Sequence, residues 1–130
     1  MKKNVVDKYL GQPWLAETQD CWWLVREIYQ NELGIEIPRA GVQANHYRAV
    51  LRAFQDSPLY QHFQRIDTPQ HLCVVILGVA HPQEHCGIYL EHIDQPILLH
   101  NQRFAGVCAE PFHELRLRDW KIHSYWKLTG

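Results

Sequence analysis

The sequence has no strong excess of either charge, and this excludes the partners that such an excess would serve. It contains 13 lysine and arginine residues against 14 aspartate and glutamate residues, for a formal net charge of -1. The two signs are interspersed, so the chain has neither the basic face that nucleic-acid binding needs nor a polybasic cluster for a membrane surface. We therefore expect no nucleic-acid partner and no membrane partner.

Long apolar runs are also missing. The longest extends from Leu72 to Ala80, which suits a buried strand and is too short to span a membrane. After Met1-Lys2-Lys3, charged and polar residues interrupt the positions that are apolar in a signal peptide. We expect synthesis in the cytoplasm without a secretion signal.

The cysteines form no dense pattern. All four lie far apart and none belongs to a CxxC pair, so we expect reduced thiols and no disulfide framework. Three of them fall in strand-like segments, where a cysteine is usually a small buried apolar residue: Cys73, Cys86 and Cys108. With 130 residues the chain is long enough for one core and too short for two, and we expect a single domain over residues 1–130.

Cys21 is the exception among the cysteines because it stands at the start of an expected helix. Thr18 or Asp20 can cap this helix, Gly34 can end it, and apolar residues follow at helical spacing: Cys21, Leu24, Val25 and Ile28. A helix N-terminus stabilises negative charge and so favours the reactive thiolate. Cys21 is therefore a candidate nucleophile, although the same stripe is also compatible with simple packing in a core.

The remaining pattern is helical first and β-rich afterwards. A second helix is expected over Gln43 to Phe54. Strand-like segments follow, and the continuous apolar run among them indicates a central strand covered on both faces: Leu72 to Val79, His85 to Glu91, Ile97 to His100, Phe112 to Arg118 and Ile122 to Leu128. The order indicates an α+β fold in which N-terminal helices pack on a central antiparallel β-sheet.

Two histidines stand at the ends of neighbouring expected strands. His85 opens one strand and His100 closes the next, with a turn favoured around Asp94. If Ile93 and Asp94 form a two-residue loop, the hairpin places His85 one diagonal step from His100 on the same face. A loop with an odd number of residues would put them on opposite faces. The shared face is the one opposite Ile88, and we expect the helix of the candidate nucleophile to lie across it.

A thiol and two imidazoles in this arrangement can perform acyl transfer. Cys21 would attack a carbonyl, His85 would act first as base and then as acid, and His100 would hold the ring of His85 in the right tautomer. The backbone N–H of Cys21 would help to bind the oxyanion. We assign further residues to the oxyanion hole and the substrate cleft, with the indole of the first as a second donor: Trp14, Asp20, Trp22 and Gly87.

Four short motifs along the chain carry a family resemblance. They are Gly11-Gln12-Pro13-Trp14, Asp20-Cys21-Trp22-Trp23-Leu24-Val25, Gly34-Ile35-Glu36-Ile37-Pro38-Arg39 and His85-Cys86-Gly87-Ile88-Tyr89-Leu90. In this order, from about Tyr9 to about His100, they resemble successive motifs of the NlpC/P60 cell-wall cysteine peptidases. The resemblance implies a papain-like α+β fold and no cofactor.

The resemblance also implies roles and a substrate. Cys21 would be the nucleophile, His85 the base and His100 the ring-orienting residue of a Cys-His-His triad. The family typically cleaves peptidoglycan stem peptides, most often between γ-D-glutamate and the diamino acid. A variant without a signal peptide is similar to the peptidase domains of bacteriophage tail proteins. Delivery to the periplasm would then come from a phage tail or from a related secretion apparatus, whose proteins would be partners.

Two other classes of function remain as alternatives. Nine histidines and the cluster His81, Glu84, His85 and Cys86 raise the question of zinc, but Pro82 prevents a helix there and adjacent strand residues point to opposite sides. We therefore expect no metal site. The second alternative is an inactive papain-like binding module of a phage tail, because Trp22-Trp23 stands where the family usually has Ser-Gly and could fill the cleft.

Overall fold

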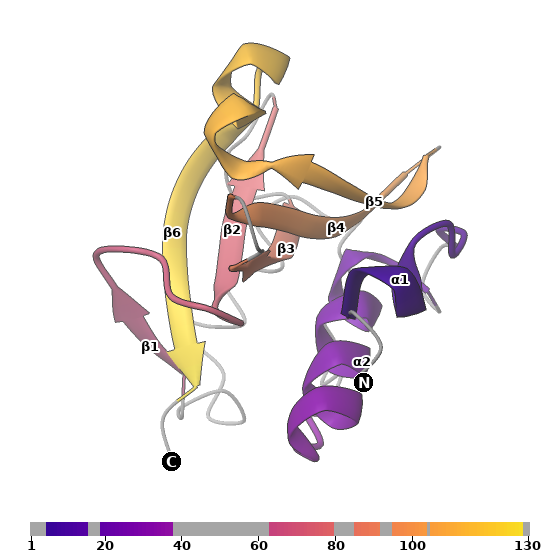
Figure 1. Cartoon of the computed structure of the whole chain (residues 1–130). Helices are drawn as coiled ribbons and strands as arrows, with labels where there is room; N and C mark the ends of the chain where they lie inside the picture. Colours follow the sequence, from indigo (N-terminus) through magenta and orange to yellow (C-terminus); the bar gives the residue numbers. More distant parts are fainter. Residues whose placement is uncertain are drawn as a thin grey trace.

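A computed structural model describes residues 5–15, 19–37, 63–79, 85–91, 95–103 and 105–128. Within these ranges a helical layer packs against a six-stranded antiparallel sheet (Figure 1). The expected α+β class, with N-terminal helical structure on an antiparallel sheet, is confirmed. The second expected helix, Gln43 to Phe54, lies outside the described residues.

Helix α2 (Cys21–Leu33) begins and ends at the residues that the sequence indicates. Asp20 caps it, because its Oδ1 accepts a hydrogen bond of 2.9 Å from the backbone N–H of Trp23. Gly34 adopts a left-handed conformation with φ 67° and ends the helix, with its N–H donating to the carbonyl of Gln30. The short helix α1 (Val5–Tyr9) precedes it, and Lys8 forms a 2.7 Å ion pair with Glu32 of α2.

The sheet has the strand order β1-β6-β2-β3-β4-β5. Its members are β1 (Phe63–Ile66), β2 (Val74–Gly78), β3 (His85–Leu90), β4 (Ile97–Gln102), β5 (Gly106–Pro111) and β6 (Lys121–Leu128). Every residue of β2 is buried, which confirms the central strand expected from the continuous apolar run. Strands β3 and β4 form a hairpin in which Ile88 pairs with Leu99.

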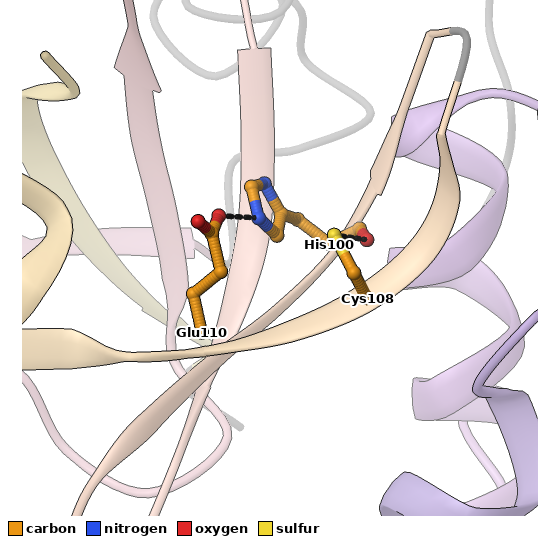
Figure 2. Close-up of side chains that lie close together, drawn as sticks. All are labelled: His100, Cys108 and Glu110. Atoms are coloured by element: carbon orange, nitrogen blue, oxygen red, sulfur yellow. Dashed lines mark hydrogen bonds and ion pairs between the residues drawn. The ribbon is translucent and has the colours of Figure 1, made fainter. Parts of the chain in front are cut away.

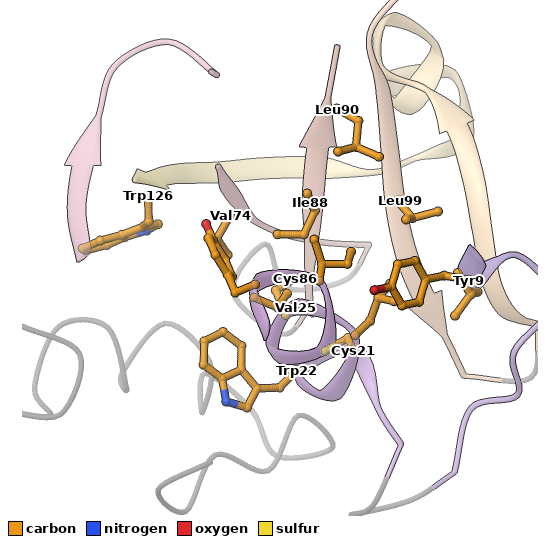
Figure 3. Packing of buried hydrophobic residues seen from close by; sticks show 14 of the residues in the cluster. Tyr9, Cys21, Trp22, Val25, Val74, Cys86, Ile88, Leu90, Leu99 and Trp126 are labelled. Carbon is orange, nitrogen blue, oxygen red and sulfur yellow. The ribbon is translucent and has the colours of Figure 1, made fainter. Parts of the chain in front are cut away.

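Each face of the sheet has its own apolar cluster, because successive strand residues point to opposite sides. On one face, side chains of β3 and β4 pack against α2, as Figure 3 shows for Ile88, Leu99 and Val25. On the other face, Leu77, Leu98 and Leu115 form a smaller cluster beneath η2 (Phe112–Arg118). The sheet is therefore covered on both sides where β3 and β4 meet.

The segment Phe112 to Arg118, expected as an alternating strand, is instead the 3-10 helix η2, so that prediction was wrong. With three residues per turn, Phe112 and Leu115 share a side and pack on the sheet. Leu117, which gave the sequence its strand-like alternation, is 82% exposed. No bounds were predicted for strand β5, which directly precedes η2, although Cys108 within it was expected to lie in a strand-like segment.

None of the described helices combines the length and the apolar character that a membrane span requires.

The cap of α2 gives a first prediction. Replacing Asp20 by Ala should lower the free energy of unfolding by about 1 kcal/mol, because the Trp23 amide loses its acceptor. Asp20→Asn should retain most of that stability, since asparagine caps equally well. Chemical denaturation followed by circular dichroism measures both variants, and equal losses in the two would contradict a capping role.

Candidate active site

The two histidines of the β3–β4 hairpin are in direct contact. Nε2 of His85 lies 2.9 Å from Nδ1 of His100, and the ring centroids are 5.1 Å apart. The pairing of Ile88 with Leu99 is the register that a two-residue loop at Ile93 and Asp94 would give, although the loop itself lies outside the described residues. The expected diagonal placement on one face is therefore confirmed.

Glu110 continues this chain of hydrogen bonds behind His100. It comes from β5, and its Oε2 lies 2.5 Å from Nε2 of His100 (Figure 2). Its other carboxylate oxygen accepts a 3.3 Å hydrogen bond from Nη1 of Arg118 in η2. These bonds, that of His100 foremost, lower the pKa of Glu110, so this carboxyl is ionised at neutral pH.

The ionised carboxylate fixes the protons of both rings. A carboxylate can only accept, so Nε2 of His100 must carry the proton that Glu110 binds. Burial lowers the pKa of His100 to about 4, which keeps the ring neutral and leaves its Nδ1 as an acceptor. That acceptor takes the proton on Nε2 of His85. In a neutral His85 the remaining nitrogen, Nδ1, then has a free lone pair and can act as a base.

Trp120 holds the outer side of this pair. Its ring stacks on His85 with centroids 5.2 Å apart and an interplanar angle of 26°. It also meets the edge of the His100 ring at 5.2 Å. The backbone N–H of Trp120 donates to the carbonyl of Leu115, which fixes the backbone of Trp120 relative to η2. The base is therefore fixed by a hydrogen bond on one side and by an aromatic ring on another.

Cys21 reaches His85 at the end of the sheet. We expected α2 to lie across the histidine face, and this was wrong: α2 packs on the opposite face, against Cys86, Ile88 and Leu90. The apolar stripe of the helix covers the apolar side of the strands, which decides the face. Cys21 and His85 are the first residues of α2 and β3, so the thiol meets the imidazole where the strand begins.

The surroundings of Cys21 favour its thiolate. A hydrogen bond from the Cys86 thiol, together with the charge and a hydrogen bond of His85, lowers the pKa of Cys21 to about 5. Burial and the negative charge of Asp20 oppose this shift. The other described thiols behave in the opposite way: burial raises the pKa of Cys73 to about 11 and raises the pKa values of Cys86 and Cys108 as well. Cys21 is thus the described cysteine whose environment activates it.

The residues just before Cys21 are attached to the sheet. Nδ2 of Asn101, a fully buried side chain of β4, donates to the carbonyls of Gln19 at 2.9 Å and of Asp20 at 3.3 Å. Asp20 is itself buried and caps α2. These bonds set the position of the helix start, and hence of Cys21, relative to the strand that carries His100.

Gly87 gives room to a histidine. A Cβ at this position would lie 2.8 Å from Cβ of His100 and 3.0 Å from the carbonyl oxygen of Leu99. We expected Gly87 to leave space for substrate, but the close approach of β4 already occupies that space. Only glycine lets the two strands bring His85 and His100 together here.

The two tryptophans assigned to the cleft have different surroundings. Trp22 is fully buried and belongs to the same apolar cluster as Cys21 and Val25 (Figure 3), which is the position of a packing residue. Trp14 is half-buried, and the Arg103 guanidinium lies over its ring at 5.6 Å from the centroid. Its role as an oxyanion donor stays a prediction.

His100, Cys108 and Glu110 form a group whose ligand atoms lie within 4.8 Å of one another, as a metal ion would require (Figure 2). Their hydrogen bonds already account for the arrangement. His100 binds Glu110, while the sulfur of Cys108 accepts a 2.7 Å bond from Nε2 of Gln102 and donates toward the carbonyl of His100 at 3.9 Å. Of the zinc cluster weighed from the sequence, His81 and Glu84 lie outside the described residues.

Sequence reasoning missed three residues of this site: Asn101, Glu110 and Trp120. One signal for Glu110 was present, because it follows the apolar run Val107 to Ala109, where an acid in a strand needs a buried partner. Trp120 and Asn101 gave no local signal, since their roles depend on packing between distant segments. The assembled site offers an activated thiol, an imidazole base with a fixed tautomer, and a buried carboxylate behind them.

Comparison with protein families gives a match over most of the chain. The model of the NlpC/P60 family matches residues 8–124, which includes every residue of the site described above. No curated protein matches the chain.

The low pKa of Cys21 gives a second prediction. Alkylation by iodoacetamide should be fastest at Cys21, and its rate should rise near pH 5 and level off by pH 7, because the thiolate is the reacting form. His85→Ala should move this rise to higher pH, since the imidazole contributes to the lowered pKa. Peptide mapping by mass spectrometry measures each site. His113→Ala, at an exposed histidine of η2, is the control, and equal, slow labelling of all four cysteines would contradict the assignment.

Proposed function

Because the chain belongs to the NlpC/P60 family, a family of cysteine peptidases that generally act on cell walls, we propose that it is a peptidoglycan endopeptidase. In this proposal Cys21 is the nucleophile, His85 is the general base and His100 is the positioning residue of a Cys-His-His triad.

The contact of Cys21 with His85 carries this proposal. The thiol stands at a capped helix N-terminus, its pKa is lowered to about 5, and the imidazole beside it is bound to His100. A packing cysteine needs none of these features, as Cys73 shows with its raised pKa. The combination is typical of a cysteine nucleophile activated by a histidine.

The proposed reaction proceeds through an acyl-enzyme. The Cys21 thiolate attacks the carbonyl carbon of the scissile amide, and the electron pair of the C=O bond moves to the oxygen. His85, protonated at this stage, gives its proton to the nitrogen of the leaving amine as the C–N bond breaks. His85 then takes a proton from water, whose oxygen attacks the thioester, and the proton returns to the sulfur as the acid is released. Glu110 stays ionised and keeps His100 in one tautomer throughout.

The oxyanion is best stabilised at the start of α2. Cys21 is the first helical residue, and the first N–H groups of a helix have no acceptor within it. Its N–H is therefore the first donor that we assign, and the positive end of the helix dipole adds to it. The indole of Trp14 is the second donor in this proposal.

A hollow beside Trp120 extends the site along the sheet. Two cationic side chains and one acid are among its lining residues, which are Val79, Arg116, Asp119, Trp120, Lys121, Ile122, His123 and Tyr125. The excess of positive charge suits the carboxylates of a stem peptide. Because Trp120 also stacks on His85, a peptide held in this hollow would lie next to the base.

Three finer assignments rest on the motif resemblance. The scissile bond would join γ-D-glutamate to the diamino acid. The setting would be a phage tail or a related injection apparatus, whose proteins would be partners of the chain. After synthesis in the cytoplasm the protein would thus act as part of a virion tail or in the periplasm.

One observation favours a second candidate function, an inactive papain-like binding module. Cys21 is only 1% exposed, so a peptide carbonyl reaches the sulfur only after the site opens. A binding module that has this fold but catalyses no reaction would not need to expose the Cys21 sulfur. The alkylation profile described above and the digestion below distinguish the two functions.

Digestion of purified peptidoglycan is the direct test of the proposed activity. The wild-type chain should release fragments with new amino termini on the diamino acid, and Cys21→Ala should release none, because the nucleophilic sulfur is gone. Mass spectrometry of the soluble products identifies the bond. Cys73→Ala is the matched control, since Cys73 is equally buried but belongs to the opposite face of the sheet. Identical products from wild type and Cys21→Ala would refute the activity.

The role of Glu110 gives a fourth prediction. In Glu110→Gln the neutral amide can turn its NH₂ group toward His100, which would reverse the proton order of both rings. We expect kcat to fall by roughly 10²-fold or more with little change in KM, as for loss of the tautomer-fixing acid in other triads. Steady-state kinetics over pH measures this. Glu114→Gln, on neighbouring η2, should behave as wild type, and a raised KM at normal kcat would contradict the positioning role.

A further inference from the structure

The contact between Cys21 and Cys86 has no part in the proposed reaction. Cys86 is the second residue of β3 and points to the α2 side of the sheet, opposite to His85. Both side chains belong to the same buried cluster, in which Figure 3 labels them, and a hydrogen bond joins the two thiol groups. Cys21 therefore touches an imidazole on one side of β3 and a second thiol on the other.

We propose that Cys21 and Cys86 form an oxidative modification site, at which a peroxide oxidises Cys21 and Cys86 then closes a disulfide with it. The site requires only the two sulfurs and the peroxide. It does not depend on the chain being a peptidase.

The chemistry has two steps, each of which balances. In the first, the Cys21 thiolate attacks one oxygen of hydrogen peroxide, the O–O bond breaks, and with one proton the products are Cys21 sulfenic acid and water. In the second, the sulfur of Cys86 attacks the sulfenic sulfur, and the hydroxide that leaves takes the Cys86 proton to form a second water. Peroxide is reduced by two electrons, and the two thiols are oxidised to one disulfide.

The low pKa of Cys21 and the position of Cys86 suit the two steps. The lowered pKa of Cys21 supplies the thiolate that reacts with peroxide. The Cys86 thiol lies in the same buried cluster as that sulfur and interacts with it, so the pair is placed to form an S–S bond. Peroxide is much smaller than a stem peptide and needs less opening to reach Cys21.

The other two cysteines are placed away from this pair. Cys73 belongs to the cluster on the opposite face of the sheet. Cys108 lies in β5 on the histidine face, where Nε2 of Gln102 binds its sulfur. All four cysteines are free in the structure. A specific Cys21–Cys86 pairing is therefore expected.

The disulfide would protect the nucleophile from irreversible loss. A sulfenic acid without a nearby thiol is oxidised further to sulfinic acid, which thiol reductants do not reverse, whereas a disulfide returns to two thiols. Cys86 would thus act as the resolving cysteine of Cys21.

Treatment of the reduced full chain with hydrogen peroxide tests this site by mass. After the free thiols are blocked, wild type should show the loss of two hydrogens and a cross-linked peptide pair that contains Cys21 and Cys86, and dithiothreitol should restore the reduced mass. Cys73→Val should behave in the same way. Cys86→Val should instead give Cys21 sulfenic acid, formed more slowly because the hydrogen bond that helps to lower the pKa of Cys21 is lost. Dimedone should trap this acid, and longer treatment should give sulfinic acid that dithiothreitol does not reverse.

Two results would overturn the proposal. One is that the oxidised Cys21 of wild type is found mainly as dimedone adduct or sulfinic acid, as in Cys86→Val. The other is a disulfide that joins other cysteines. The wild-type peptide map decides the question even if Cys86→Val does not fold. A peptidoglycan digest that is unchanged in Cys21→Ala would remove the proposed activity and leave this mass result standing.

Discussion

The buried hydrogen bond between His100 and Glu110 is the constraint on which the chemistry of this site depends. Because Glu110 is ionised and His100 is neutral, the bond admits one arrangement of protons. That arrangement extends through the 2.9 Å contact to His85 and leaves Nδ1, the nitrogen of His85 that does not face His100, with the lone pair of a base. A histidine pair without the carboxylate could exchange its protons and adopt either tautomer. Glu110 therefore selects the single tautomer in which Nδ1 of His85 can accept a proton.

The fold brings the first residue of α2, Cys21, to the first residue of β3, His85, as the proposed chemistry requires. Asp20 and Asn101 fix the first residue of α2, and Gly87 lets β3 and β4 approach until the two imidazoles touch. The helix covers the apolar side of the strands while the histidines occupy the other side. Cys21 and His85 can meet because both stand at the end of their elements, where the sheet no longer separates the two faces.

The sequence predicted the local features of this site more successfully than the layers around it. Cap and stop residues gave the bounds of α2, and loop parity gave the face shared by His85 and His100. It did not predict which face α2 covers, because both faces of β3 need a covering layer and only tertiary packing decides between them. The alternation around Leu117 imitated a strand, and the bounds of β5 and the role of its Glu110 were not predicted.

Cys86 has two opposite effects on the neighbouring sulfur. Its hydrogen bond, together with His85, lowers the pKa of Cys21 against a burial that alone would keep the thiol protonated. Lowering the pKa in this way increases the thiolate fraction and with it the reactivity toward any electrophile, peroxides as well as carbonyls. Activation by an adjacent thiol therefore exposes the nucleophile to oxidation and, in the same contact, provides the group that can reverse it.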